Sequence, residues 1–375
     1  MKKPKILLIT GLLAALLVTS GFMNGIHASD QEFTLKEIGL IPVEGYANDV
    51  QVVGDIVYLT DWLEGFLVYN VSNPANQSLL GSYECNNNIN PAVKGAKTFL
   101  VRGDYAIVGF QHAGLKILDI SDPTTLELVG EYFGSRDTYH IQVVDDLVYM
   151  AMEYDGLQII DISDVTRPTK VGEFNNGNPL FHIHVIGNIA YLRDYGQNHT
   201  LCLDVTDPSN ITEIKQFDWG AYNIAMDDNI GYLCAIAGGV LTYNFSDPTE
   251  PTFIDEYYDG GNSADIAISN NLAFVADVED GLEILDITNP GDLVEIAQFN
   301  DGGRSRNVFV DGNVAYISEF EDGLEIIQLW DEEANSTDST SNKITSFELV
   351  LVLLGFLALR VRVIENRRKK LLKHI

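Results

Sequence analysis

The sequence predicts an all-β protein: a seven-bladed β-propeller of four-stranded antiparallel blades, in which an N-terminal strand closes the last blade. Three observations lead to this prediction. A unit of about 42 residues recurs seven times between residues 30 and 330. Each unit carries similar sequence markers in the same order, and helical periodicity is absent from this part of the chain. Units of 40–45 residues with four short strands are typical of propeller blades.

The markers are a glycine that opens an apolar strand, a turn sequence just downstream of that strand, and an aromatic residue in the strand upstream. The turn reads Asp/Asn-x-Ser/Thr-Asp/Asn, in most units followed by Pro, as in Asp119–Pro123 and Asp286–Pro290. The glycine recurs at spacings of 39 to 49 residues, counting Thr200, which replaces it in unit four. It stands at Gly65, Gly114, Gly156, Gly239, Gly281 and Gly323. Markers that stay in phase over this length indicate a repeat architecture.

Unit three shows the predicted strands most clearly. They are His140–Val144, Leu147–Met152, Leu157–Ile162 and Thr169–Phe174. Asp-Asp, Tyr-Asp-Gly and Ser-Asp sequences separate them, and these are common turn formers.

Ring closure follows from a mismatch between the two ends of the array. Unit seven runs into a polar segment without a fourth strand, whereas a lone strand, Phe33–Ile41, precedes unit one. The sequence FTLKEIGLIP is similar to fourth strands such as LELVGEYF. We therefore expect the N-terminal strand to complete the last blade, which removes two exposed sheet edges.

The repeat resembles the LVIVD-repeat family. The sequences GLQIIDISD, GLKILDISDP and GLEILDITNP carry the pattern Gly-Leu-x-Ile-x-Asp-Ile-Ser/Thr most clearly, and the resemblance covers nearly all of Thr34–Leu329. It implies a secreted or surface β-propeller and little about activity, because members are mostly known as repeats.

The two ends of the chain have the composition of targeting segments. Residues 1–28 contain three lysines, an apolar run and small or polar residues, which predicts a signal peptide; an uncleaved anchor is the alternative. The propeller, 30–330, is followed by a polar Ser/Thr-rich linker, 331–346, and by an apolar segment, 347–364, predicted as a transmembrane helix. A basic tail, 365–375, indicates that the propeller lies outside the cell. This C-terminal arrangement resembles the sorting signals of archaeal and bacterial surface proteins.

The charge of the chain excludes nucleic acid as a partner. The chain has a net charge of −31, and residues 29–346 hold 13 Lys and Arg against 52 Asp and Glu. Such a body repels phosphate backbones and favours cations, basic partners and solubility.

The turn motif, the cysteines and the glycosylation sequons are each given a structural interpretation. Asx and Ser side chains bond local backbone, so the recurring turn is expected to be structural. Cys202 and Cys234 lie on strands of neighbouring blades, as buried thiols or as one disulfide. Four sequons fall in predicted turns or in the linker and are expected to accept glycans: Asn76, Asn198, Asn210 and Asn335.

One polar residue stands near the start of the first strand of every unit, and we call these seven the ring residues. They are Asp49, Thr98, His140, His182, Asn223, Asp265 and Asn307. Because an apolar residue follows each one, strand alternation places the polar side chains together at the mouth of the central channel. The family usually has Asp here, and this chain keeps it in units one and six.

Two groups of candidate metal ligands include ring residues. Oxygen ligands from blades six, seven and one suit Ca²⁺: Asp49, Asp61, Asp265, Asp277 and Glu319. Blades three and four offer a set suited to Zn²⁺: His140, His182, His184 and Asp194. The alternative for both sets is a ring whose members cap loops or hydrogen-bond one another around a water-filled channel.

The predicted function is that of a cell-surface-anchored binding or adhesion module, which recognises an extracellular protein or glycan at the channel mouth with the assistance of a cation. Aromatic residues in face-side loops favour such recognition, with packing between blades as the alternative. They are Trp62, Tyr132, Phe133, Tyr139, Tyr154, Phe181, Tyr195, Trp219, Tyr222 and Phe320. No catalytic motif is present, so a non-enzymatic role is favoured. The alternatives are a metal- or carboxylate-dependent hydrolase at the same mouth and a structural surface-layer component. The ligand and the oligomeric state stay open.

Overall fold

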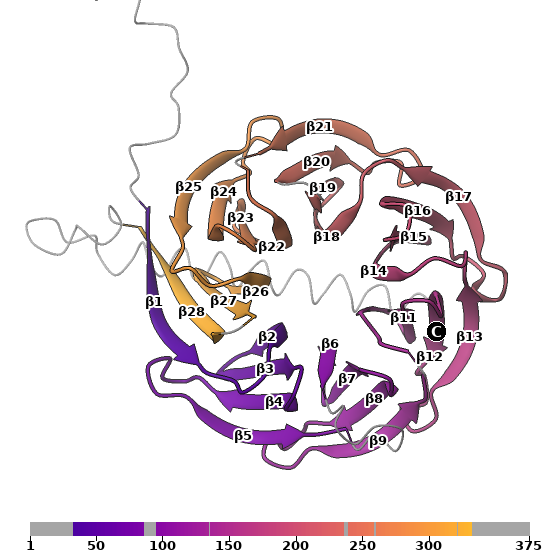
Figure 1. Ribbon diagram of the computed structural model, residues 1–375, viewed down its shortest axis with the longest axis horizontal. Helices are drawn as coiled ribbons and strands as arrows, with labels where there is room; N and C mark the ends of the chain where they lie inside the picture. The colour runs from indigo at the N-terminus through magenta and orange to yellow at the C-terminus, as the bar shows by residue number, and fades with distance from the viewer. Residues whose placement is uncertain are drawn as a thin grey trace, which may run out of the picture. The chain divides into compact units, whose positions relative to one another are not determined.

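The computed structural model describes residues 33–85, 95–134, 136–235, 239–258, 260–320 and 322–331. In these residues 28 strands form seven four-stranded antiparallel sheets, arranged as blades around a central axis (Figure 1). They belong to one compact unit, Glu32–Trp330. The predicted seven-bladed propeller is therefore confirmed.

Each blade is built from strands that are consecutive in sequence. Blades one to three are β2 (Ala47–Val53), β3 (Ile56–Asp61), β4 (Gly65–Asn70) and β5 (Ser78–Tyr83); β6 (Ala96–Arg102), β7 (Tyr105–Phe110), β8 (Gly114–Asp119) and β9 (Glu127–Tyr132); and β10 (His140–Val144), β11 (Leu147–Ala151), β12 (Leu157–Asp161) and β13 (Thr169–Phe174). Blades four and five are β14 (Leu180–Ile186), β15 (Ile189–Asp194), β16 (His199–Asp204) and β17 (Thr212–Phe217), with the short 3₁₀ helix η1 (Pro208–Asn210); and β18 (Ala221–Asp227), β19 (Ile230–Ala235), β20 (Val240–Asn244) and β21 (Thr252–Tyr257). Blades six and seven are β22 (Ser263–Ser269), β23 (Leu272–Asp277), β24 (Gly281–Asp286) and β25 (Val294–Phe299); and β26 (Ser305–Asp311), β27 (Val314–Glu319), β28 (Gly323–Asp331) and β1 (Phe33–Ile41).

The N-terminal strand closes the ring as the sequence predicts. β1 is the outer strand of blade seven, in the order β1-β28-β27-β26, and in Figure 1 it joins the outer rim beside β28. Its bounds, Phe33–Ile41, are those predicted. At the end of β1, the carbonyl oxygen of Ile41 approaches Gly323 so closely that a Cβ there would lie 2.2 Å from it, and Gly323 has a φ of 105°. Gly323 is therefore required for two reasons: its φ is unfavourable for other residues, and a side chain here would collide with the Ile41 carbonyl oxygen.

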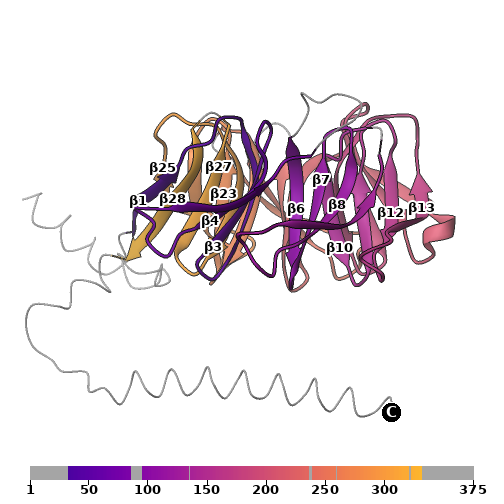
Figure 2. The same ribbon diagram turned by 90° about the horizontal axis from the view of Figure 1, so that it is seen from below.

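The core lies between the blades. Ile107 and Leu115 of blade two pack with Met150 and Ile160 of blade three, and all four are buried. Similar clusters span the other neighbouring blades, from blades three and four to blades seven and one. Since each buried aliphatic side chain contributes about 1.5–3 kcal/mol, this packing holds the inner strands, and the residues on them, in place. Figure 2 shows the propeller edge-on.

The recurring turns are structural, as predicted. Asp119 Oδ1 accepts from the Ser121 amide at 2.9 Å, and Asp122 Oδ1 accepts from the Thr124 amide at 2.9 Å. Equivalent pairs of Asx turns occur in blades one, three, four, five and six. They fix the link from the third strand to the fourth.

Several predictions on the termini lie outside the described residues: the signal peptide 1–28, the linker 331–346 apart from its first residue, the segment 347–364, the tail 365–375 and Asn335. Within the part of the chain that the structure describes, no helix has the length and apolar character needed to cross a membrane. Asn76, Asn198 and Asn210 are exposed, on the turn after β4, the turn after β15 and η1. Cys202 and Cys234 are buried free thiols, so of the two alternatives the disulfide is not formed.

Candidate functional site

All seven ring residues line one cavity at the mouth of the channel. The cavity measures about 450 Å³, which is within the usual range of small-molecule sites. The residues after the second strands of blades one, four and seven, Trp62, Tyr195 and Phe320, line the same space. The starts of the first strands and the ends of the second strands therefore meet at one face. We call this space the channel-mouth cavity.

In six of the seven blades, a bulge in the inner strand brings a second residue into the cavity wall. In blade one Ala47 pairs with Asp61 and Asp49 pairs with Thr60, so Asn48 is an extra residue between two ladder rungs. The same shift occurs at the start of the first strands of blades two, four, five, six and seven. Bulges of this kind redirect side chains. The residue before the ring residue lines the cavity in all seven blades, and in blade three it does so without a register shift. These residues are Asn48, Lys97, Tyr139, Phe181, Tyr222, Ala264 and Arg306.

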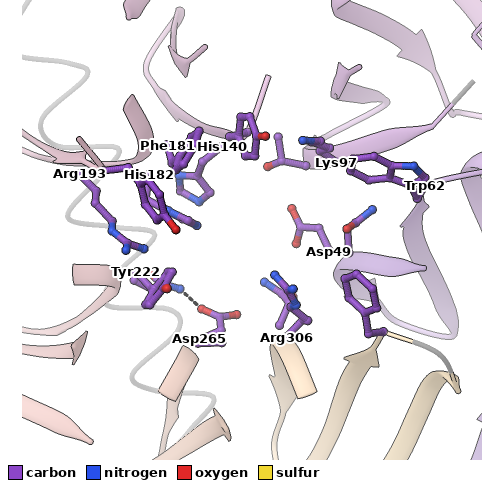
Figure 3. Close-up of a pocket in the computed structure, with 18 residues that line it drawn as sticks. Asp49, Trp62, Lys97, His140, Phe181, His182, Arg193, Tyr222, Asp265 and Arg306 are labelled. Carbon is purple, nitrogen blue, oxygen red and sulfur yellow. Dashed lines mark hydrogen bonds between the residues drawn. The ribbon is translucent and has the colours of Figure 1, made fainter. Parts of the chain in front are cut away.

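Four ring residues accept a hydrogen bond from a backbone amide of the blade that follows them. A fifth, Asn223 of blade five, donates from Nδ2 to Asp265 Oδ1 of blade six (Figure 3). Asp49 Oδ2 accepts from the Phe99 amide at 3.1 Å, and Asn307 Oδ1 accepts from the Val50 amide at 3.2 Å. In the same way, Asp265 Oδ2 accepts from the Val308 amide at 2.9 Å, and His140 Nδ1 accepts from the Ile183 amide at 3.3 Å. Each acceptor thus bonds the residue after the next ring position. The polar residue at the ring position has a structural role wherever it makes this bond.

Blade four departs from the pattern. The bond to the next blade comes from His184, whose Nε2 accepts from the Ile224 amide at 3.1 Å. The ring residue of this blade, His182, has a buried Nδ1 with no hydrogen-bond partner among the described residues. His182 is therefore released from the bridging role and lines the cavity beside Arg193 and Tyr222 (Figure 3).

Three cationic side chains line the cavity: Lys97, Arg193 and Arg306. None of them was predicted from the sequence as a site residue. Arg193 lies across the cavity from Lys97, and Arg306 lies near Asp49 and Asp265 (Figure 3). The charge of Lys97 is compensated by an ion pair, because its Nζ lies 2.8 Å from Asp137 Oδ2. Its Nζ also lies 3.4 Å from the centre of the Tyr139 ring.

Arg193 lies in an aromatic environment and makes no ion pair with the residues that the structure describes. Its guanidinium carbon is 3.8 Å from the centre of the Tyr222 ring and 5.2 Å from that of Tyr195. The side chain is 2% exposed, and Nε and Nη1 have no hydrogen-bond partner among the described residues. A buried charge without a partner is costly, so an uncompensated guanidinium in a cavity wall indicates a missing acceptor.

The repeat itself contains a signal that would have identified Arg193. Its position is the penultimate residue of the second strand, opposite the ring residue. The other six blades have small side chains at this position: Thr60, Gly109, Ala151, Cys234, Ala276 and Ser318. The arginine of blade four is the exception among the seven.

Enclosure in the channel wall shifts the ionisation of the ring toward neutral forms. Desolvation by burial raises the pKa of Asp265 to about 8 and that of Asp49 to about 6, against the hydrogen bonds that their carboxylates accept. Burial lowers the pKa of His140 to about 4 and that of His182 well below its ordinary value. At neutral pH the histidines and Asp265 are therefore largely uncharged.

The structure disperses the predicted calcium ligands. Asp49 and Asp265 line the cavity, but Asp61 and Asp277 do not. Asp61 Oδ1 accepts from the Leu63 and Glu64 amides, and Asp277 Oδ1 accepts from the Glu279 and Asp280 amides. These two carboxylates cap the turns after the second strands. Glu319 accepts from Ser305 Oγ at 2.9 Å.

Among the described residues, the acidic group close enough to share an ion is Asp301, Glu319 and Glu325 of blade seven. Desolvation raises the pKa of Glu319 to about 7 and that of Glu325 to about 9. These shifts favour protonated carboxyl groups when no cation is bound.

The predicted zinc ligands are brought together in part. The ring centres of His182 and His184 lie 5.7 and 5.6 Å from that of His140. However, His140 Nδ1 and His184 Nε2 already accept backbone hydrogen bonds. Asp194 lies away from the cavity, where its Oδ2 accepts from Asn176 and Asn178 at 2.6 and 2.7 Å.

Comparisons with known proteins agree with this architecture. A sequence model of the LVIVD repeat matches residues 44–85, 95–133, 135–176, 260–301 and 302–329, more than half of the chain. The unmatched blades, four and five, supply Arg193 and Tyr222. No curated protein matches the sequence.

Solved β-propellers are similar in fold at low identity. The β-propeller domain of Cps50 (Swd1) from Myceliophteria thermophila is 12% identical with a TM-score of 0.61, over 78% of this chain and 99% of that one. The WD40 β-propeller domain of Doa1 is 10% identical with a TM-score of 0.60, over 78% and 97%. The computationally designed Ika8 protein is 12% identical with a TM-score of 0.54, over 78% and 99%. The repeats matched and the seven blades observed show that the chain belongs to the LVIVD-repeat family.

Proposed function

We propose that the protein is a cell-surface recognition module that binds a small part of an extracellular ligand, such as a glycan or a protein side chain, in the channel-mouth cavity. The observation that carries this proposal is the convergence of all seven ring residues on one cavity of about 450 Å³. Six aromatic residues line the same space: Trp62, Tyr139, Phe181, Tyr195, Tyr222 and Phe320. Aromatic rings beside amide side chains suit recognition of small polar molecules.

Attachment to the cell surface is supported by the sequence of the two ends. An apolar run follows lysines near the N-terminus, and a polar linker, an apolar segment and a basic tail form the C-terminus. Protease treatment of intact cells should digest the propeller, and detergent should be required to release the full-length chain. Survival of the propeller in intact cells would contradict the proposed location.

Blocking the cavity tests the binding function. Ala264 lines it and carries the smallest side chain of the lining set, so Ala264→Trp should fill the space without removing a bridging hydrogen bond. A panel of neutral and acidic monosaccharides and amino acids would be titrated into full-length wild-type protein by calorimetry. We expect at least one saturable binding event that Ala264→Trp abolishes.

The matched control places the same bulky residue on the outer rim. Ser78 is exposed on β5, and Ser78→Trp should leave binding unchanged. Binding that survives Ala264→Trp, or a panel without any saturable event, would overturn the proposal in favour of a structural surface component.

Cation assistance is a separate part of the proposal. Asp49 and Asp265 face the cavity, and a Ca²⁺ ion held there would take its other oxygens from water and the ligand. Titration of metal-stripped protein with Ca²⁺ and with Zn²⁺ tests both predicted ions. Flat heats for both would remove cations from the function.

A hydrolase at the same mouth is the second candidate, favoured by the two carboxyl groups with raised pKa in one cavity. Both groups accept backbone hydrogen bonds that join blades. Turnover of aryl glycosides, lost in both Asp49→Asn and Asp265→Asn variants that retain the fold, would support this candidate.

A further inference from the structure

We infer that the ligand of the channel-mouth cavity carries a carboxylate, which binds at the Arg193 side of the wall. This inference rests on the proposed binding function and names the chemistry of its ligand. Arg193 is the member of the cavity wall that is both buried and without a hydrogen-bond partner for Nε and Nη1, within the described part of the chain.

The position of Arg193 in the repeat indicates that it is not needed to build a blade. Six blades have Thr, Gly, Ala, Cys, Ala or Ser at the equivalent place, and all seven blades have the same strand order. The blade therefore tolerates a small residue there. A large buried cation that the fold does not require is best explained by a ligand.

The surroundings of Arg193 do not neutralise it. The faces of Tyr222 and Tyr195 cover the guanidinium, and neither ring supplies a full negative charge. Burial lowers the pKa of the neighbouring His182 well below its ordinary value, and the charge of Arg193 contributes in the same direction, so His182 is neutral. Asp194, the adjacent residue, points to the other face of the strand and bonds Asn176 and Asn178.

A second guanidinium in the cavity wall, that of Arg306, adds to the attraction for an anion. Arg306 makes no ion pair with any residue in the described ranges, and its guanidinium carbon lies 4.6 Å from the centre of the Phe320 ring. Asp49 and Asp265 bond the amides of Phe99 and Val308. A cationic chamber at the centre of a chain with a net charge of −31 concentrates small anions that the outer surface repels.

A carboxylate fits this chamber because the planar guanidinium group can donate two parallel hydrogen bonds to its two oxygens. The aromatic wall and the amides of Asn48, Asn223 and Asn307 suit a ring or a polyhydroxylated body attached to it. An acidic sugar and an aromatic acid share this chemistry.

The test is a titration of full-length protein with glucuronate, glucose, benzoate and inorganic phosphate. Glucuronate and glucose differ at the carboxylate, so we expect glucuronate to bind at least tenfold more tightly if the ligand is a sugar acid. Tight binding of benzoate alone would assign the carboxylate to an aromatic acid instead. If phosphate binds more tightly than both carboxylates, or if glucose equals glucuronate and benzoate does not bind, the inference is wrong.

Variants of Arg193 make the assignment specific. Arg193→Ala installs the residue that blades three and six have at this position, so the variant should fold, and it should weaken carboxylate binding at least tenfold. Arg193→Lys should restore it only in part, because an ammonium group lacks the planar pair of donors. The matched control is Arg102→Ala, at the end of the inner strand β6 away from the cavity-lining Lys97 and Thr98, where Arg102 pairs with Asp146 at 3.0 Å. This variant should bind as wild type does.

The melting temperature provides a second readout. The two roles predict opposite changes: loss of a structural arginine would lower the melting temperature, whereas loss of a ligand-binding arginine would not. Without ligand, Arg193→Ala should melt at or above the temperature of the wild type, because an unpaired buried charge is removed. A clearly lower melting temperature would assign Arg193 to the scaffold and overturn the inference. Loss of carboxylate binding in Ala264→Trp alone, with Arg193→Ala unaffected, would leave the cavity as the site and reject Arg193 as its anion anchor.

Discussion

Asn307 of blade seven accepts a hydrogen bond from the backbone amide of Val50 of blade one across a sequence separation of 257 residues. This bond closes the inner ring, as β1 closes the outer rim beside β28. Between them, the two contacts join the ends of the repeat array at its smallest and largest radius. The positions of the ring residues around the cavity depend on both.

The inner closure predicts the behaviour of two Asn307 variants. Asn307→Leu removes the acceptor and leaves the Val50 amide without a partner, which should lower the free energy of unfolding by about 1–3 kcal/mol. Asn307→Asp keeps an acceptor oxygen and should retain most of the stability. Chemical denaturation followed by circular dichroism measures both. Equal loss in the two variants would show that the bond itself does not stabilise the ring.

Ionisation of Asp265 should make stability depend on pH. Its folded pKa of about 8 lies above its ordinary value, so the folded protein holds this proton more tightly than the unfolded chain does. The stabilising contribution is fully present below about pH 4 and is lost as the pH rises toward 8, at up to about 1.4 kcal/mol for each pH unit.

Asp265→Asn should remove this part of the pH dependence while keeping an acceptor for the Val308 amide. The comparison is the difference in melting temperature between variant and wild type at pH 5 and pH 8. Asp49, Arg306 and Asn223 share the cavity wall with Asp265 and are unchanged in both proteins. A difference that does not grow with pH would contradict the assigned burial of the charge.

Close approach between neighbouring blades predicts a strong effect at Gly130. A Cβ at this position on β9 would lie 1.9 Å from the Val165 carbonyl oxygen of blade three. Gly130→Ala should therefore lower the free energy of unfolding by about 1–3 kcal/mol. The control is Gly291→Ala, where the nearest atoms lie at 3.7 and 3.8 Å, and it should stay within about 0.5 kcal/mol of wild type.

The buried pair at the blade-two side of the cavity should show strong coupling. Lys97 and Asp137 are both 8% exposed and lie 2.8 Å apart. Lys97→Met or Asp137→Asn alone should lower the free energy of unfolding by about 3–5 kcal/mol, because Asp137→Asn leaves the buried Lys97 without its ion pair and Lys97→Met leaves the buried Asp137 with His112 alone, at 3.2 Å. The double variant should lose less than the sum, which a double-mutant cycle measures. Strict additivity would contradict a direct pair.

The cysteines should behave as inert thiols. Cys85, Cys202 and Cys234 are free and buried, and burial raises the pKa of each thiol. A thiol reagent should therefore label none of the three quickly in the native protein and all three after unfolding in guanidinium. Labelling of only one cysteine after unfolding would reveal a disulfide.

Architecture was predictable from the sequence because each blade repeats the same turn chemistry. The glycine before the third strand, the Asx turns after it and the orphan strand Phe33–Ile41 each specify a local conformation, and their phase specifies a ring. Ring residues could be located for the same reason. One residue per repeat, placed by strand alternation, is sufficient to find the channel.

Other features of the site were not predictable from alternation. A bulge adds a residue at the start of the inner strands, so Lys97 and Arg306 line the cavity together with Thr98 and Asn307, whereas strict period two would turn them away. The same geometry separates Asp61 and Asp277 from the cavity, because their carboxylates cap turns. Of the five predicted calcium ligands, Asp49 and Asp265 thus line the cavity.

Small side chains opposite the ring residues have a consequence for how this chamber can change. Blades three and six offer Ala151 and Ala276 at the place that Arg193 takes in blade four. A single replacement at either one would add charge, bulk or a nucleophile to the same space from another direction while the scaffold stays as it is. The selectivity of the proposed binding site is therefore adjustable one sector at a time, independently of the framework that surrounds it.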